Sequence, residues 1–92
     1  MTHFEALMIM LTREGIPFKV AVQPYYCTPQ ILILDADGEV VGDVICHNHS
    51  YGGADGLLEL MGCGTERLEE GVLGWLTASR ACFLIKEFFG KI

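Results

Sequence analysis

A continuous apolar run, a tight turn and an alternating run constrain the fold of this chain more than any other segment. Residues Ile31–Leu34 have the uninterrupted hydrophobicity of a central strand that is covered on both faces. Residues 35–38 read Asp-Ala-Asp-Gly, which is typical of a turn whose glycine adopts a positive φ. Residues 39–47 then alternate, with Asp43 and His47 on one face, as expected for an antiparallel partner. The sequence therefore predicts a central β-hairpin.

Two amphipathic segments at the ends of the chain have helix-starting signals. Thr2 and Glu5 have the spacing of a capping box, in which each side chain bonds the backbone amide of the other residue. Apolar residues follow at helical spacing until Gly15, which suits a left-handed helix end. Thr77 is a good N-cap for a final helix that runs to about Phe89. We therefore expect a helix at each end.

Shorter segments complete the predicted fold. Residues 18–22 alternate like a half-buried strand, and residues 72–76 suit a fourth short strand. Residues 56–61 are predicted to form a short helix that starts after Asp55. Together these elements predict a single α+β domain over residues 1–92. Its parts are an N-terminal helix, a three- or four-stranded antiparallel sheet and a C-terminal helix packed on one face.

The composition narrows the possible partners. A formal net charge of −6 with only six scattered Lys and Arg residues argues against direct binding to nucleic acid. No signal-peptide pattern is present, no apolar run is long enough to span a membrane, and the cysteines form no C-x-x-C pair. We therefore expect a cytoplasmic protein without a membrane partner. Because 51% of the residues are hydrophobic, we also expect a homo-oligomer, with Ile9 and Met10 as candidate contacts.

The segment from His47 to Gly62 concentrates histidine, serine, tyrosine and glycine at a density that core packing does not require. Glycines let a ligand or a second backbone approach closely, and Tyr51 offers a broad ring and a hydroxyl for contact. The alternative is that the glycines only permit a tight turn, with Tyr51 tucked beneath it. The predicted ligand or partner site consists of His47, His49, Ser50, Tyr51, Gly52, Gly53, Glu59 and Trp75.

The residue pattern supports a catalytic function less well than a binding function. Cys46, His47, His49 and Cys63 are zinc-ligand types, but consecutive strand residues such as Cys46 and His47 point to opposite faces. The glycines are not a Walker loop, because no Lys-Ser/Thr pair follows them. We therefore predict no metal, no cofactor and no catalytic residue. A small metal-dependent hydrolase that uses His47 and His49 is the alternative.

The C-terminal half resembles a group of short, mostly uncharacterised proteins encoded by phages and prophages of Gram-positive bacteria. In that group a "CH…SYG…GLLE" segment is followed by a "VxGYLTA" segment and a final helix. The matching residues here are Asp43–His47 with Ser50–Gly52, then Gly56–Gly62, then Val72–Ala78. Trp75 stands where the group tends to have Tyr. The resemblance implies a phage accessory role and brings no established chemistry with it.

This resemblance leads us to expect a small non-enzymatic binding protein that inhibits a bacterial anti-phage defence system. It would sequester a small nucleotide-like signal or hold a host defence protein. An acidic mimic of nucleic acid, as in some anti-CRISPR proteins, is a further alternative that the net charge allows. A pocket at a dimer interface, lined by Tyr51 and Trp75, would favour sequestration, whereas a single acidic face without a pocket would favour inhibition of a protein.

Overall fold

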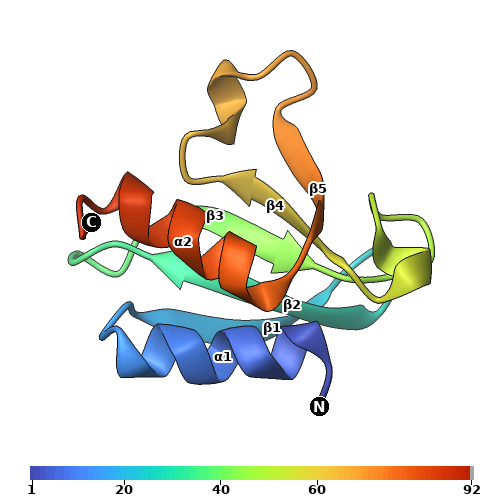
Figure 1. Ribbon diagram of the computed structural model, residues 1–92, viewed down its shortest axis with the longest axis horizontal. Coiled ribbons are helices and arrows are strands. Elements are labelled where there is room, and N and C mark those ends of the chain that lie inside the picture. Colours follow the sequence, from blue (N-terminus) through green and yellow to red (C-terminus); the bar gives the residue numbers. More distant parts are fainter. Residues whose placement is uncertain (92) are drawn as a thin grey trace.

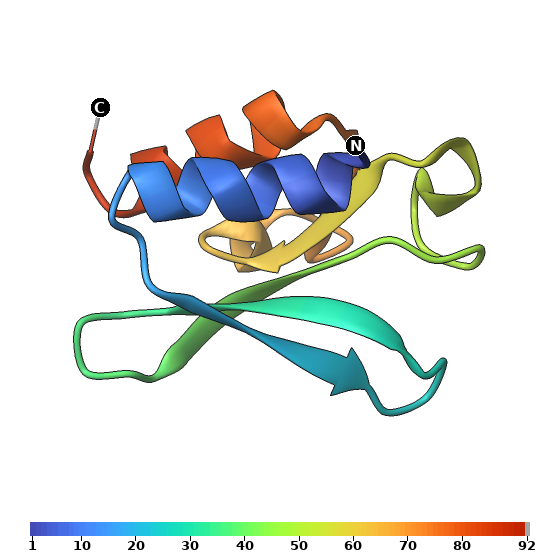
Figure 2. The same cartoon turned by 90° about the horizontal axis from the view of Figure 1, so that it is seen from below.

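The chain folds into a five-stranded antiparallel sheet with both helices on one face (Figures 1 and 2). The computed structural model describes residues 1–91. The strand order β1-β2-β3-β4-β5 follows the sequence, so each strand pairs with the next. The elements are α1 (His3–Arg13), β1 (Phe18–Gln23), β2 (Thr28–Leu34), β3 (Val40–Ile45), the 3-10 turn η1 (Gly53–Asp55), β4 (Leu58–Gly62), the 3-10 turn η2 (Thr65–Arg67), β5 (Val72–Leu76) and α2 (Ala78–Phe88). The α+β class is confirmed, with five strands instead of three or four.

Both predicted helix starts are confirmed by their capping hydrogen bonds. The Thr2 amide donates to the Glu5 carboxylate at 2.9 Å, and the Glu5 amide donates to the Thr2 hydroxyl at 3.1 Å. The hydroxyl of Thr77 accepts from the Arg80 amide at 3.2 Å. Gly15 ends the first helical segment with a φ of 70°. Each of these helix-end signals involves residues that are close together in the sequence, which is why the sequence alone predicts them.

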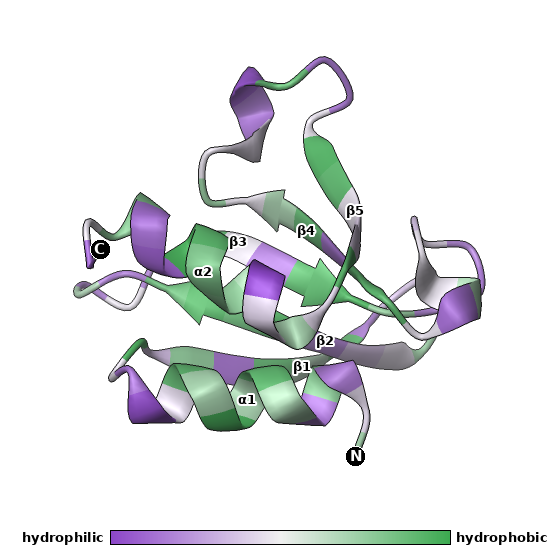
Figure 3. Cartoon of the chain, in the orientation of Figure 1, coloured by the Kyte–Doolittle hydropathy of each residue, from purple (hydrophilic) through white to green (hydrophobic). Residues whose placement is uncertain are grey.

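The core lies between the two helices and the covered face of the sheet. α1 contributes Leu7 and Leu11, and α2 contributes Ala81 and Ile85. The strands contribute Ile31, Ile33, Val44, Leu58, Leu60 and Leu76. Hydrophobic residues accordingly run along α1 and the strands, whereas η2 is hydrophilic (Figure 3). Within residues 1–91, neither helix has the length and apolar character needed to cross a membrane.

The central hairpin is confirmed, but its first strand is covered on one face only. Ile31 pairs with Val44 and Leu32 with Asp43, in the antiparallel register that the sequence predicts. Ile31 and Ile33 are fully buried, whereas Leu32 and Leu34 are only half-buried. The expectation of cover on both faces was wrong, because both helices lie on the same side of the sheet.

The predicted short helix over residues 56–61 is wrong. The 3-10 turn Gly53–Asp55 lies just before this segment, and residues 58–62 form strand β4. The free edge of β3 provides backbone partners for this segment, and Val44 pairs with Leu60. Leu58 and Leu60 point into the core, and Met61 is 53% exposed. Strand pairing with β3 therefore decides the conformation, and it accounts for the fifth strand.

Two alanine substitutions in β4 test this correction. Leu60→Ala is expected to lower the free energy of unfolding by about 2–5 kcal/mol, because it removes a buried side chain. Met61→Ala should change it by less than about 1 kcal/mol, because Met61 lies on the exposed side of the strand. Urea denaturation measures both. In a helix over residues 56–61, Met61 would share the buried face with Leu57 and Leu58, so a large loss for Met61→Ala would contradict the strand.

Candidate functional site

The face of the sheet opposite to the helices, here called the open face, is covered by no element of the described chain (Figure 2). The register places Leu32, Asp43, Met61 and Val72 in one row across β2 to β5. A neighbouring row runs through Gln30, Ile45 and Glu59. The first row continues to the exposed Lys19 of β1, so the open face combines partly exposed apolar side chains with two carboxylates and, toward β1, one lysine.

The two carboxylates of the open face are partly desolvated. The amide nitrogen of Gln30 donates to Asp43 at 2.8 Å, but burial still raises the pKa of Asp43 above its ordinary value. Burial also raises the pKa of Glu59, the backbone amide of Tyr51 lowers it, and the nearby charge of Asp43 raises it further. Both acids are therefore less well solvated than ordinary surface carboxylates, and a cationic group of a partner would relieve that cost.

Tyr51 and Trp75 form an exposed aromatic stack beside Glu59. Their rings are nearly parallel, with an interplanar angle of 7° and centroids 5.4 Å apart. Leu58 pairs with Leu76 and Leu60 with Leu73, so Gly74 and Trp75 together oppose the single residue Glu59 in a β-bulge. Tyr51 is 40% exposed and Trp75 is 60% exposed. The bulge thus presents Trp75 at the surface next to a carboxylate.

The backbone of Trp75 is held in an unfavourable conformation. Its φ is 53°, in the left-handed region that bulky residues rarely adopt and that costs about 1–2 kcal/mol. The amide of Trp75 donates to the carbonyl of Tyr51 at 3.1 Å, which helps to hold this geometry. A strained, exposed aromatic residue is a reason to look for function at that position.

Glycines allow the segment after β3 to pack closely against β5. A Cβ on Gly74 would lie 2.2 Å from the Cβ of Tyr51, and one on Gly52 would lie 2.8 Å from the backbone of Trp75. A Cβ on Gly53 would lie 1.8 Å from the carbonyl oxygen of His47. No other residue fits these three positions without rearrangement. Gly52 and Gly53 therefore hold the loop in place, as the turn alternative proposed, and thereby position the aromatic stack.

The side chain of Ser50 also stabilises the conformation of this loop. Its hydroxyl donates to the carbonyl of His47 at 2.8 Å, and it accepts from the amide of His47 at 3.0 Å. Both hydrogen bonds close the turn that follows β3. This hydroxyl is therefore engaged within the chain and not directed toward a ligand.

The two histidines lie in a second aromatic cluster, with Tyr26 from the β1–β2 turn. The ring centroid of Tyr26 is 4.2 Å from that of His47 and 5.3 Å from that of His49. Nδ1 of His47 accepts from the backbone amide of His49 at 3.0 Å, so the ring proton lies on Nε2. Nε2 is buried and has no hydrogen-bond partner within residues 1–91. His47 thus offers no free lone pair for a metal or a substrate proton.

Within the described chain, the side chains are not arranged to bind a metal ion, and the Cys46 thiol is not activated as a nucleophile. Residues 1–91 contain no group of three or more His, Cys, Asp or Glu side chains placed to hold a metal ion. Burial raises the pKa of the Cys46 thiol, which disfavours the reactive thiolate. The hydrolase alternative based on His47 and His49 therefore gains no support from this geometry.

The structure brings Tyr51, Glu59 and Trp75 together, and it gathers His47 and His49 separately around Tyr26. His47, His49 and Tyr51 all lie in the segment that leads from β3 to η1, so both clusters are at that end of the sheet (Figure 1). Sequence reasoning did not include Asp43 in the site, although its alternation with Ile45 already placed it on the open face. Tyr26 had no such signal, because the turn between β1 and β2 has no periodic pattern.

The fold and the site define a small α+β domain with one open, partly aromatic sheet face. Comparison of the chain with protein-family profiles, curated proteins and solved structures found no match. The geometry of this face is therefore the structural basis for a functional proposal.

Replacing Glu59 by glutamine is expected to stabilise the protein at neutral pH. The pKa of Glu59 is raised from its ordinary value of 4.5, so the native state keeps a proton over a pH window in which the unfolded chain has lost it. Native stability falls as the pH rises through that window, and the penalty persists above it. Glutamine carries no charge and can still accept from the Tyr51 amide, so Glu59→Gln should be more stable at pH 7.

This advantage should disappear below about pH 3, where the carboxyl is protonated in both states. Urea denaturation of both proteins between pH 3 and pH 7 checks the prediction. The gain should be small, because solvent still screens a partly exposed carboxylate. Glu69→Gln is the control, since Glu69 is exposed and away from the open face. An advantage that grows as the pH falls would contradict the assigned cause.

Proposed function

We propose that this protein is a small, non-enzymatic binding protein that holds a partner protein on its open face, at the end that carries Tyr51 and Trp75. The observation that carries the proposal is the exposed Trp75, stacked on Tyr51 and kept in a strained backbone conformation. Tryptophan and tyrosine are enriched among the residues that dominate binding energy at protein interfaces. A preformed stack also loses little conformational freedom when a partner binds.

The surroundings of the stack favour a basic group on the partner. A guanidinium or ammonium group can lie over the face of Trp75, which is the strongest aromatic acceptor of a cation. Glu59 lies next to the stack, and Asp43 adds a second negative charge. The net charge of −6 would attract such a partner over a longer range.

A protein partner fits this site better than a sequestered nucleotide. Tyr51 and Trp75 stack on one another, so their facing surfaces are not free to hold a base. The hollows that border α2 are lined by other residues, from the helix side of the sheet. An exposed surface of aromatic and acidic side chains suits contact with a protein.

The biological setting of the proposal comes from the resemblance to short phage and prophage proteins. On that basis the partner is a protein of a bacterial anti-phage defence system, and binding inhibits it in the cytoplasm of the host cell. Trp75 lies in the segment that carries the resemblance, at a position where that group tends to have another aromatic residue, Tyr. An aromatic ring at this position in both fits a binding role.

Substitutions of Trp75 test the proposed function. Trp75→Gly removes the ring but keeps the bulge, because glycine adopts a positive φ without steric cost. We expect its stability to stay within about 1 kcal/mol of the wild type and its affinity for the partner to fall by about 30-fold or more. Trp75→Tyr keeps an aromatic contact and should retain most of the affinity.

The assay expresses each variant in bacteria that carry individual defence systems and measures the plating efficiency of a phage that each system blocks. The wild-type protein and Trp75→Tyr should restore plating against at least one system, and Trp75→Gly should not. Thermal melting confirms that all variants are folded. A folded Trp75→Gly protein that inhibits as well as the wild type would contradict the assigned site.

We also propose that the chain forms a homodimer or a higher oligomer. β1 is an edge strand, and its Val20 and Val22 are 51% and 67% exposed on the helix side of the sheet. An exposed apolar edge can pair with a second copy. Met10 packs against the core instead of being free for such a contact, whereas Ile9 is partly exposed.

Light scattering at high micromolar concentration is expected to give a mass above that of the 10.2 kDa monomer. Val22→Lys should shift this mass toward the monomer, because it places a charge on the edge. A monomeric wild-type protein would contradict the proposed oligomer and leave the role of Trp75 unaffected.

A further inference from the structure

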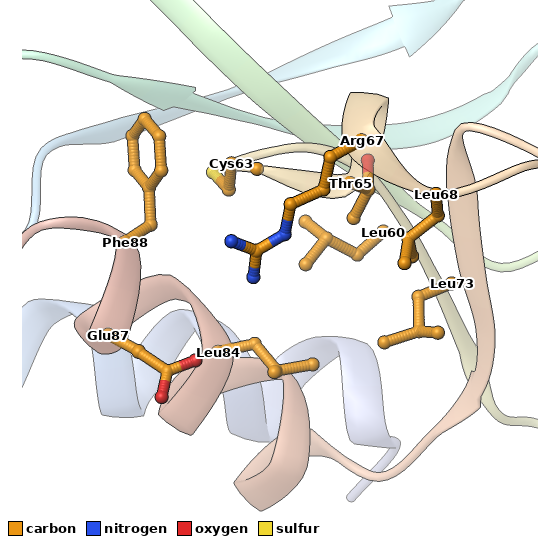
Figure 4. A pocket seen from close by; sticks show the side chains of 10 residues that line it. Leu60, Cys63, Thr65, Arg67, Leu68, Leu73, Leu84, Glu87 and Phe88 are labelled. Carbon is orange, nitrogen blue, oxygen red and sulfur yellow. The ribbon is translucent and has the colours of Figure 1, made fainter.

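A second feature lies on the helix side of the sheet, away from the open face. α2 and the connection between β4 and β5 line a cavity of about 570 Å³ that is open to solvent on one side (Figure 4). Ligand sites for small molecules typically span about 300–1,000 Å³. Leu60, Leu73 and Leu84 line its apolar floor, and Phe88 closes one side. The cavity therefore has the size of a small-molecule site, with an apolar floor and polar side chains at its rim.

The wall formed by the β4–β5 connection is held in place by hydrogen bonds. The hydroxyl of Thr65, which is buried, accepts from the amide of Gly62 and donates to the carbonyl of Gly71, both at 2.8 Å. Cys63 has a φ of 52° between two glycines that also have positive φ, so the chain reverses sharply there. These contacts join both ends of the connection, so the wall is preformed and a ligand need not order it.

Arg67 is the only cationic residue among those that line the cavity. Its guanidinium group points into the hollow, between Phe88 and Leu84 (Figure 4). The one ion pair within 4 Å in the described chain joins Lys86 and Glu14, so Arg67 has no carboxylate partner at that distance. The planar guanidinium is thus free to bind a carboxylate through two parallel hydrogen bonds.

The acidic residues around the cavity disfavour a ligand that carries more than one negative charge. Glu87 lines the α2 side, and Glu66, Glu69 and Glu70 belong to the same connection as Arg67 without lining the hollow. Glu87 is the one carboxylate among the lining residues, and solvent screens the exposed glutamates of the connection more than it screens a direct contact between Arg67 and one carboxylate. A phosphate or polyanion would be repelled more strongly.

We propose that this cavity binds a small amphiphile with one carboxylate, whose apolar chain lies on the leucine floor and whose carboxylate pairs with Arg67. The site is suited to binding and not to covalent chemistry, because burial raises the pKa of the lining thiol of Cys63 to about 12. The inference does not depend on the proposed partner contact, since Trp75 lies on the other side of the sheet.

Octanoate is the test probe, with octyltrimethylammonium as a comparator of equal chain length and opposite charge. Titrations followed by two-dimensional NMR give the affinity and the residues that respond. We expect octanoate to bind at least tenfold more tightly than octyltrimethylammonium, with shifts at Leu73, Leu84 and Phe88. Arg67→Gln should weaken octanoate binding by about tenfold, as expected for losing a charge-assisted hydrogen bond. Glu87→Gln should strengthen it, because it removes a like charge.

Two control variants separate this site from general effects. Arg13→Gln makes the same change in net charge at an exposed position of α1 outside the cavity, and it should leave octanoate binding unchanged. Trp75→Gly should also leave it unchanged. Equal or tighter binding of octyltrimethylammonium, unaltered affinity in Arg67→Gln, or shifts confined to the open face would each overturn the proposal.

Discussion

Burial of a single face of the sheet under two helices is the constraint on which the rest of this structure depends. α1 and α2 lie side by side, and the amide of Ala78 at the start of α2 donates to Nδ1 of His3 in α1 at 3.1 Å. Because the helices cover one face only, the alternation of each strand divides its side chains between a core and an exposed surface. The open face is free to carry aromatic and acidic residues that the core would not accept.

The geometry of that surface depends on close backbone packing. Gly52 and Gly74 let the segment around Tyr51 lie directly against β5, and the bulge opposite Glu59 turns Trp75 outward. Gly52, which belongs to the binding loop that the sequence suggests, is thus also needed to build the aromatic stack. Architecture and function are not alternatives here, because the tight turn is what presents Tyr51 and Trp75 together.

Sequence reasoning succeeded where interactions are local. The capping box of Thr2 and Glu5, the N-cap of Thr77 and the hairpin between Ile31 and Ile45 involve neighbours in sequence or a tight turn, and all are present. It failed at residues 56–61, where the leucines suit a short helix but pair with β3 instead. It grouped His47 and His49 with Trp75 in one site, whereas the structure places both histidine rings beside Tyr26 and the Trp75 ring beside Tyr51.

The sequence by itself determined the α+β class, the two helices and the central hairpin, because caps, turns and hydrophobic periodicity act within a few residues. Only the tertiary structure decided that β4 is a strand, that Trp75 stacks on Tyr51 and that Arg67 points into a cavity beside α2. Each of these depends on segments far apart in the chain that satisfy one another's backbone hydrogen bonds or share one apolar surface. Such pairings follow from the packing of the whole domain, which local patterns do not encode.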